Sequence, residues 1–319
     1  MTRYIAKRFL LMIPTLLGVA VLVFVLLRVL PGDVVEMRFA SGQNQFVDQK
    51  MLDAERAKLG LDKPIWQQFR DYLTGLLRLD LGRSMWTGSP ITEEIKLRFA
   101  LSLQLALMAT LVATVLAIPL GILAALRQDT WVDYAVRVFS IAGLAMPSFW
   151  LGIVLILVFA VSLDVLPSAG VTSADSDTLA DRLAHLVLPT VALATTILPT
   201  VVRFTRSSTI EVLHEDYVRT ATSKGLRPRT VMTRHALRNA LIPVVSAIGA
   251  LVPRLIGGTV VTEAVFGWPG MGRLALEAAQ GRDYPLVTGL TVVVAAIAVL
   301  ASLLVDLAYT RIDPRVRIG

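Results

Sequence analysis

Cysteine is absent from the chain, and charged residues are scarce. Without a thiol, the chain can form neither a disulfide framework nor a thiolate metal site. Asp, Glu, Lys and Arg make up 17% of the 319 residues, against roughly 25% in an ordinary soluble domain. The hydrophobic share is 55%. A soluble protein of this length could bury much apolar sequence, but it would not need the long uncharged runs found here.

The motifs of common enzymes are missing as well. There is no Walker A pattern and no Gly-Lys pair, so the chain lacks the usual cradle for a nucleotide phosphate. His214 and Glu215 begin like the zinc motif H-E-x-x-H, but position 218 is Val, and His185 and His235 are distant. No G-x-S-x-G nucleophile elbow occurs. We therefore expect no catalytic site, no metal site and no cofactor in this chain.

Long apolar blocks are what the sequence does contain. A helix needs about 20 apolar residues to cross a hydrocarbon layer of about 30 Å. Unpaired backbone groups are not tolerated in lipid, and the blocks do not alternate as barrel strands would, so they must be helices. The sequence predicts an all-α polytopic membrane protein with six transmembrane helices, near residues 9–30, 99–126, 136–163, 185–205, 241–262 and 286–309.

The net charge is +7, and the basic residues are distributed along the chain as a membrane topology would require. If the N-terminus is cytoplasmic, the cytoplasmic pieces hold sixteen Lys and Arg residues. The short outer loops, 164–184 and 263–285, hold only Arg182, Arg273 and Arg282. This asymmetry obeys the positive-inside rule and predicts that both termini are cytoplasmic. The basic excess therefore indicates topology rather than a nucleic-acid partner. The first apolar block lacks a small-residue cleavage site, and we expect a retained span.

Residues 31–98 form a polar insert on the outer side, between the first span (1–30) and the remaining membrane domain (99–319). Pro31-Gly32-Asp33 ends the first helix. Within the insert, apolar residues recur at helical spacing and predict an amphipathic helix that packs on the membrane domain or on a partner. These residues are Ile65, Phe69, Tyr72, Leu73, Leu76 and Leu77.

The longest cytoplasmic loop, 203–243, contains residues that commonly begin and end short helices. A helix is expected over 208–223, with Ser207 or Ser208 as its N-cap. Gly225 stands where a helix-ending glycine would, and Pro228 suits the first turn of a second helix. Two short basic amphipathic helices joined by a glycine would make a knob for the groove of a partner protein. The alternative is a basic loop that faces lipid and only sets the topology.

This loop resembles the cytoplasmic coupling loop of bacterial ATP-binding-cassette import permeases. The general pattern is Glu-Ala-Ala, three residues and Gly, where this chain has Arg219-Thr220-Ala221 and then Gly225. The replaced Glu and the distant Pro243 are typical of the peptide-and-nickel branch. Other segments resemble that branch in the same order, namely Leu30-Pro31-Gly32-Asp33, 59–64, 80–84, Pro147-Ser148-Phe149-Trp150, 266–272 and 313–317.

The resemblance implies the type I importer permease fold and an assembly in the bacterial cytoplasmic membrane. The expected partners are a second, related permease, two ATPase subunits that hold ATP and Mg, and a soluble or lipid-anchored binding protein. The expected cargo is a dipeptide or oligopeptide, with nickel, glutathione and opine or sugar conjugates left open. The residues expected to contact the ATPase are Tyr217, Arg219, Thr220, Ala221, Lys224 and Gly225.

Ionisable residues inside spans are candidates for the translocation path. Arg28 can extend to the interface, whereas Arg254 is expected in the outer half of the bilayer. Arg254 either meets a substrate carboxylate or pairs with an acid on another helix. Glu263 and Pro147 are further possible pathway residues.

Two other classes of membrane protein stay open. One is a secondary transporter working alone, but the midplane acids and inverted repeats expected of that class are not visible in the sequence. The other is a structural or sensory subunit.

Overall fold

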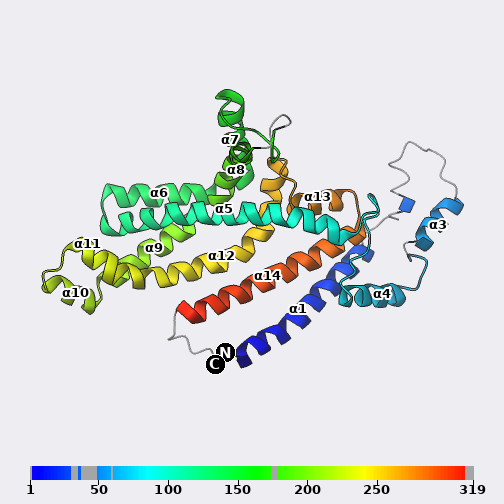
Figure 1. Cartoon of the computed structure of the whole chain (residues 1–319), viewed down its shortest axis with the longest axis horizontal. Coiled ribbons are helices and arrows are strands. Elements are labelled where there is room, and N and C mark those ends of the chain that lie inside the picture. The colour runs from blue at the N-terminus through cyan, green and yellow to red at the C-terminus, as the bar shows by residue number, and fades with distance from the viewer. Residues whose placement is uncertain (1, 30–34, 37–48, 59, 174–177, 313–319) are drawn as a thin grey trace. The chain divides into compact units, whose positions relative to one another are not determined.

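A computed structural model describes residues 2–29, 35–36, 49–58, 60–173 and 178–312 of the chain. Within these residues the regular elements are helices, with an isolated antiparallel bridge between Arg83 and Pro90, which confirms the all-α class. The chain divides into two compact units (Figure 1). Unit 1 comprises Met1–Arg98 and Leu274–Ala296, and unit 2 comprises Phe99–Arg273 and Ile297–Gly319.

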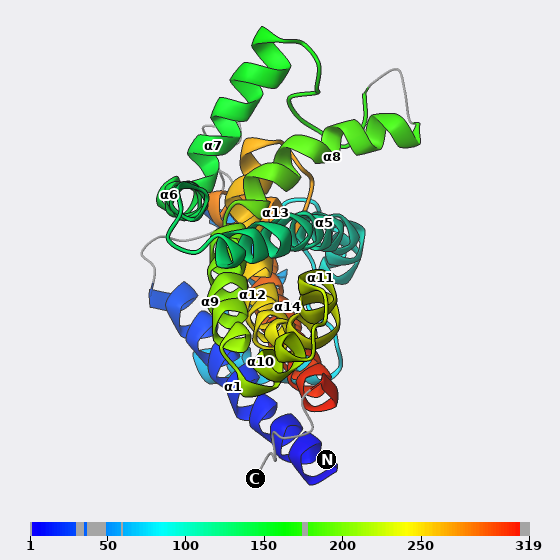
Figure 2. The ribbon, with the colours of Figure 1, turned by 90° about the vertical axis from the view of Figure 1, so that its left-hand side faces the viewer.

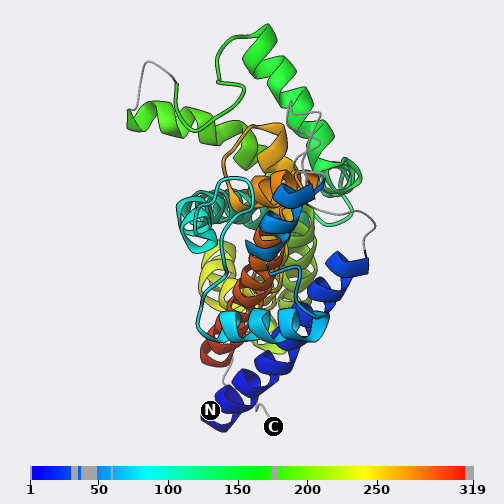
Figure 3. The same ribbon diagram turned by 90° about the vertical axis from the view of Figure 1, so that its right-hand side faces the viewer.

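Unit 1 contains α1 (Thr2–Val29), α3 (Gln49–Lys58) and α4 (Ile65–Leu77), together with parts of α5 (Ile91–Leu126), α13 (Met271–Gln280) and α14 (Tyr284–Ile312). The predicted amphipathic helix is α4, which crosses α1 (Figure 3). Phe69 and Tyr72 place their rings 5.1 and 5.7 Å from the ring of Phe24. Ile65 and Leu77, which the same pattern put on the apolar face, are exposed. The apolar stripe of α4 is therefore only partly covered in this chain.

A buried carboxylate fastens the insert to the turn before α14. Asp283 accepts hydrogen bonds from the Ser84 hydroxyl at 2.5 Å and from the Met85 backbone N–H at 3.0 Å. Beside it, the Trp86 indole donates to the Gly281 carbonyl at 2.7 Å. Asp283 is 1% exposed, and a buried charge of this kind needs such donors. Specific hydrogen bonds thus hold residues 84–86 of the insert to the turn before α14.

Unit 2 is a helical bundle of α5, α6 (Trp131–Ala145), α7 (Ser148–Leu155), η1 (Ile156–Ser162), α8 (Leu179–Ala194), α9 (Leu198–Leu213) and α12 (Leu237–Val265). Figure 2 shows α9 and α12 side by side. Small residues on α5 allow close helix approach, as is common in membrane bundles. An added Cβ at Gly121 would lie 2.5 Å from the Thr205 Cβ on α9. The core of this bundle includes Leu105, Ala109, Ala113, Ala117, Ile197, Val201 and Val244.

Three described helical stretches are long and apolar enough to cross a membrane: Leu10–Val29, Ile91–Leu126 and Tyr284–Val305. Two bent helix pairs raise the number to five if each pair is one span. One pair joins α6 to α7 and η1 with a bend of 100°, and the other joins α8 to α9 with a bend of 57°. The predicted span 241–262 lies within α12, where the side chains of 252–254 and 256 lie outside the described residues.

The helices predicted over 136–163 and 185–205 are each broken by a bend. Pro147 lacks a backbone N–H and disfavours a helical conformation at the residue before it. Met146 accordingly has an extended backbone, with φ −82° and ψ 125°, and Pro147 precedes the first residue of α7. The second break falls between the end of α8 at Ala194 and the start of α9 at Leu198. The apolar blocks are real, but each contains a change of helix direction.

A buried ion pair joins α6 to α9. Asp133 is fully buried and accepts two hydrogen bonds from Arg206, at 2.6 and 2.7 Å. The Asp129 backbone N–H donates to the same carboxylate at 3.1 Å, and Arg137 lies 3.3 Å from it. Bidentate pairing of guanidinium and carboxylate is strong and directional. Asp133 and Arg206 are 73 residues apart, and no local pattern in the sequence links them.

Close packing at Gly121 can be tested by substitution. Gly121→Ala should destabilise the protein by about 1 to 3 kcal/mol, because the new methyl group would overlap Thr205 and push α5 away from α9. Thermal unfolding of the purified protein in detergent measures this. Gly18→Ala in α1 is the matched control, since an added Cβ there meets nothing within 4 Å. Equal melting temperatures for the two variants would contradict the packing argument.

The buried pair gives a second prediction. Asp133→Asn should cost about 3 kcal/mol, because it leaves the partly buried Arg206 guanidinium without its counter-charge. Asp216→Asn, which breaks the exposed pair with Arg219, should cost less than about 1 kcal/mol. Thermal unfolding compares the two variants with wild type. The two substitutions would have equal effects if Asp133 were only a surface acid.

Candidate functional site

The predicted coupling loop (203–243) is ordered by helices along its whole length. α9 runs to Leu213, α10 spans Asp216–Ser223, and α11 (Pro228–Thr230) continues through η2 (Val231–Ala236) into α12. Figure 1 shows α10 and α11 together at one end of unit 2. A folded, helical loop of this kind fits a docking element better than an irregular lipid-facing loop.

The prediction of one helix over 208–223 is wrong. The chain breaks at His214 and Glu215, so the segment is divided between α9 and α10. Ser208 caps no helix, because it lies inside α9, where its hydroxyl donates to the Ala240 carbonyl at 2.7 Å. Ser207 likewise bonds back to the carbonyl of Arg203 at 3.0 Å. α9 extends further than predicted because its buried side chains continue to pack on α12.

The predicted glycine turn is confirmed. Gly225 follows α10 with a φ of +77°, a left-handed conformation that glycine adopts at little cost. Its N–H donates to the Thr222 carbonyl at 2.9 Å, and the Leu226 N–H donates to the Ala221 carbonyl at 3.4 Å. These two bonds form a Schellman motif, which closes the end of the helix. Pro228 is the first residue of α11, as the sequence indicated.

One face of α10 is buried inside the loop. Val218 and Ala221 pack with Val231 and Ala236 in a small apolar core. Ala221 is 6% exposed, so its side chain contacts the loop itself rather than the surface. Of the six residues expected to contact an ATPase, Ala221 is thus the one that the structure places in the interior. It fixes how α10 sits against the rest of the loop.

Away from this core, the surface of α10 and of Lys224, which follows it, is exposed and mostly polar. We call Tyr217, Arg219, Thr220 and Lys224 the coupling face, since all four are exposed. The Arg219 side chain is 73% exposed and lies 3.5 Å from Asp216. The Tyr217 hydroxyl accepts a hydrogen bond from the Asn239 amide at 2.8 Å, which ties α10 to the start of α12. The coupling face therefore combines an anchored aromatic ring with two cations.

Glu263 is fully buried and lines no open surface of unit 2. The Ser102 hydroxyl donates to one carboxylate oxygen at 2.6 Å, and the Arg273 backbone N–H donates to the other at 3.0 Å. The Met271 N–H in turn donates to the Ser102 hydroxyl at 2.8 Å. A negative charge is favourable at the N-terminus of a helix, here α13. Within this chain Glu263 therefore anchors α13 to α5 and α12, and its role in the pathway stays a prediction.

The residue types in segment 266–272 follow from its close packing around the Glu263 carboxylate. Phe266 and Trp268 are buried, at 2% and 0% exposure. An added Cβ at Gly270 would lie 2.4 Å from the Glu263 carboxyl carbon. One at Gly272 would lie 2.5 Å from the Cα of Val260. Both glycines are needed for the close approach of α13 to α12, so this segment has a structural role.

The remaining predicted residues are less fully described. Pro147 is exposed and lies at the bend between α6 and α7. Arg254 belongs to α12, but its side chain lies outside the described residues, so its pathway role stays a prediction. The segments 30–33 and 313–317 also lie outside them. Among the described His, Asp and Glu side chains, no three come together as metal ligands.

Known proteins resemble this chain along nearly its full length. The family described as binding-protein-dependent transport system inner membrane component matches residues 117–318, and the N-terminal family of the same systems matches 1–106. The oligopeptide transport system permease protein AppB of Bacillus subtilis is 38% identical, over 99% of both chains. The di/tripeptide permease DppB of Pseudomonas aeruginosa and the glutathione permease GsiC of Pectobacterium atrosepticum are each 40% identical, also over 99% of both chains.

A solved structure shares the fold. The inward-facing MetNI methionine ABC transporter aligns with a TM-score of 0.58 at 15% identity, covering 69% of this chain and 96% of that chain. At that identity the likeness concerns the fold alone. The full-length relatives and the family match decide the identity: this chain belongs to the family of binding-protein-dependent transport system inner membrane components, the permease subunits of ATP-binding-cassette importers.

Proposed function

We propose that the chain forms half of the translocation path of a dipeptide or oligopeptide importer and couples to a cytoplasmic ATPase through α10. The observation that carries this proposal is the two-sided construction of α10. Its inner face packs in the loop core, and its coupling face is exposed at the end of two packed membrane helices. A short, firmly held helix with a free face suits insertion into a groove of a partner.

The geometry suggests how movement would pass from the ATPase to the membrane. α11, η2 and α12 follow one another without a gap from Pro228 to Val265. The loop core joins α10 to the start of this helical run and to the last turn of α9. Because packed cores transmit displacement rather than absorb it, a shift of α10 would move α9 and α12 together. ATP-driven closure of the partner would in this way change the access of the path.

The proposed assembly contains a second, related permease, two ATPase subunits with ATP and Mg, and a soluble or lipid-anchored binding protein. Six spans would place both termini in the cytoplasm, with α12 as the fifth span and each bent pair crossing once. The basic residues of the coupling loop support this orientation. In this arrangement ATP hydrolysis belongs to the partner, and this chain supplies the path and the coupling face.

The cargo is proposed from the relatives. Their names refer to oligopeptides, di- and tripeptides and glutathione, at nearly equal identity to this chain. All these molecules carry carboxylates on a peptide-like backbone, so one path could accept them while the binding protein selects among them. Arg254 is the residue of this chain that we propose to meet the substrate carboxylate. Nickel chelates and opine or sugar conjugates are less favoured, because the relatives named above do not refer to them.

Charge reversal on the coupling face tests the proposal directly. Arg219→Glu should reduce ATP hydrolysis stimulated by the loaded binding protein about tenfold or more, because it places an acid where the partner meets a cation. The purified complex in nanodiscs, supplied with peptide-loaded binding protein, is the system to measure. Arg70→Glu, an equally exposed change on α4, is the control. Unchanged stimulation in an intact Arg219→Glu complex would exclude α10 as the coupling element.

The glycine turn gives a graded test. Gly225→Val should cost about 1 to 2 kcal/mol, because a β-branched residue resists the left-handed conformation. Gly225→Asn should cost less, since Asn tolerates that conformation. Space around the glycine is open, so side-chain overlap plays no part. Stimulated ATP hydrolysis should fall in the order Gly, Asn, Val, and identical activities would show that the turn geometry does not matter for coupling.

A further inference from the structure

Helix α4 carries three large apolar side chains on a side that the described part of unit 1 leaves largely open. We call Trp66, Leu73 and Leu77 the open stripe. They lie within about 40° of one another around the helix, since each residue advances the chain by about 100°. Trp66 is 61% exposed and Leu77 is 86% exposed, while Leu73 is partly buried. Apolar surface gathered in this way is costly to leave in water.

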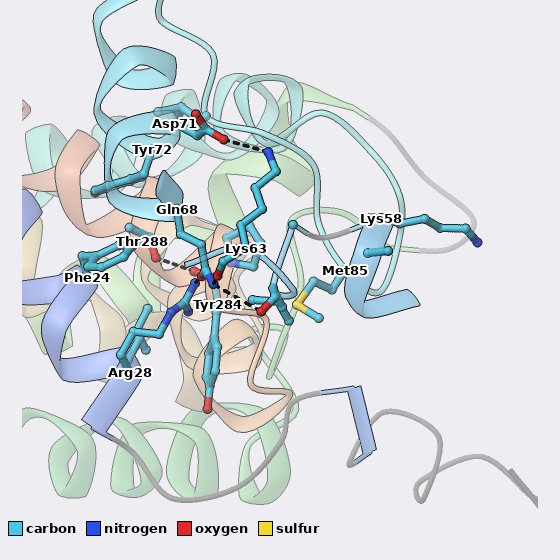
Figure 4. A pocket seen from close by; sticks show the side chains of 16 residues that line it. Phe24, Arg28, Lys58, Lys63, Gln68, Asp71, Tyr72, Met85, Tyr284 and Thr288 are labelled. Atoms are coloured by element: carbon cyan, nitrogen blue, oxygen red, sulfur yellow. Dashed lines mark hydrogen bonds and ion pairs between the residues drawn. The ribbon is translucent and has the colours of Figure 1, made fainter. Parts of the chain in front are cut away.

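A neighbouring side of α4 packs on α1. Phe69 and Tyr72 place their rings against the ring of Phe24. The Arg28 guanidinium donates to the Gln68 side chain (Figure 4). These contacts fall within about one turn of each helix, which is the pattern of two helices that cross. Because α1 is long and apolar enough to span a membrane, α4 lies across the direction of the span.

The level of this contact on α1 gives the depth of α4. The apolar stretch of α1 is Leu10–Val29, and Phe24 lies five residues before its end. At about 1.5 Å per residue, the crossing is about 8 Å inside the end of the stretch. Amphipathic helices that lie in a membrane surface bury their apolar face by about 5 to 10 Å. The crossing thus places α4 at the boundary between lipid headgroups and acyl chains.

Acyl chains surround α1 at the same level. Val25, Leu26 and Val29 are exposed apolar residues of α1, next in sequence to the residues that contact α4. A spanning helix presents such side chains to lipid. The open stripe lies on a helix that touches α1 at this level, so lipid is the occupant that the position of the stripe favours.

The far side of α4 is polar. Thr74 and Asp71 are exposed, and the Asp71 carboxylate pairs with Lys63 at 2.8 Å (Figure 4). That hydrogen bond holds the pKa of the Asp71 carboxyl below its usual range, so the pair stays charged at neutral pH. A solvated ion pair on one side and apolar residues on another are the distribution of a helix in a membrane surface. Tryptophan, here Trp66, is enriched at that level.

We propose that α4 lies in the membrane surface, with the open stripe in contact with the lipid acyl chains. One side of the helix then rests on α1 and another on lipid, and the polar side faces water. The insert is held at a fixed depth, because lifting α4 toward water would expose the open stripe. The proposal depends on α1 as a membrane span and is independent of the coupling face and of the cargo.

Single spin labels test this placement, since the chain has no cysteine of its own. Trp66→Cys and Leu77→Cys put labels on the open stripe, and Gln67→Cys and Thr74→Cys put matched labels on the polar side. Leu22→Cys, on an exposed apolar residue of α1, is the lipid reference. In the complex in nanodiscs, power saturation compares collisions with oxygen, which concentrates among acyl chains, and with a water-soluble nickel chelate. The oxygen-to-nickel ratio at 66 and 77 should approach that at 22 and exceed that at 67 and 74 at least about threefold.

Two results would overturn the proposal. Labels at 66 and 77 that meet the nickel chelate as often as the label at 74 would place the open stripe in water. Labels at 66 and 77 shielded from both reagents would show that a protein surface covers it. Leu77 is 86% exposed in the last turn of α4, so its label decides the question alone if Trp66→Cys prevents assembly. Either result leaves the role of α10 to be judged by its own tests.

Discussion

The packing of α9 against α12 sets the position of every residue in the coupling loop. Val201 on α9 and Val244 on α12 are fully buried in the same core, and the Ser208 hydroxyl bonds the Ala240 carbonyl across the interface. The loop between the two helices then closes on its own apolar core. Since both ends of the loop are held by this packing, the orientation of α10 follows from it. A change in the α9–α12 contact would reorient the coupling face, and a force on α10 would act on that contact.

Two buried carboxylates fix the helices of unit 2 in complementary ways. Asp133 is neutralised by Arg206 and ties α6 to α9. Glu263 is bound instead by a hydroxyl and by the backbone at the start of α13. Buried charge is costly unless it is paired and hydrogen-bonded, so each carboxylate permits only a narrow range of helix positions. These constraints favour rigid-body movement of the bundle over local distortion.

Much of this arrangement follows from local sequence patterns. The apolar blocks predicted the helical class, the periodicity at Phe69 and Tyr72 predicted α4, and Gly225 and Pro228 marked the turn after α10. Each of these features depends on residues close together in the chain. The orientation of the termini, the six spans and the ATPase contacts stay predictions.

Other features depend on long-range contacts that no local pattern reveals. The Asp133–Arg206 pair and the burial of Glu263 arise only when distant helices meet. The extent of α9 differs from the prediction for a similar reason. Serine is a common N-cap residue, yet packing on α12 keeps Ser208 inside α9. Its hydroxyl there donates to the Ala240 carbonyl on the neighbouring helix. At Pro147 the breaking residue was visible, but the sequence does not give the 100° bend.

The most direct test of the central claim uses the absence of cysteine from the chain. A single Thr220→Cys substitution places one thiol on the exposed face of α10, and Thr74→Cys provides an exposed control on α4. The measurement is cross-linking from that thiol to the ATPase subunit in the assembled complex, with and without ATP. The account predicts an ATP-dependent cross-link from position 220 and none from position 74. If position 220 gives no cross-link and stays equally reactive to a soluble thiol reagent with and without the ATPase, α10 does not couple the permease to ATP hydrolysis.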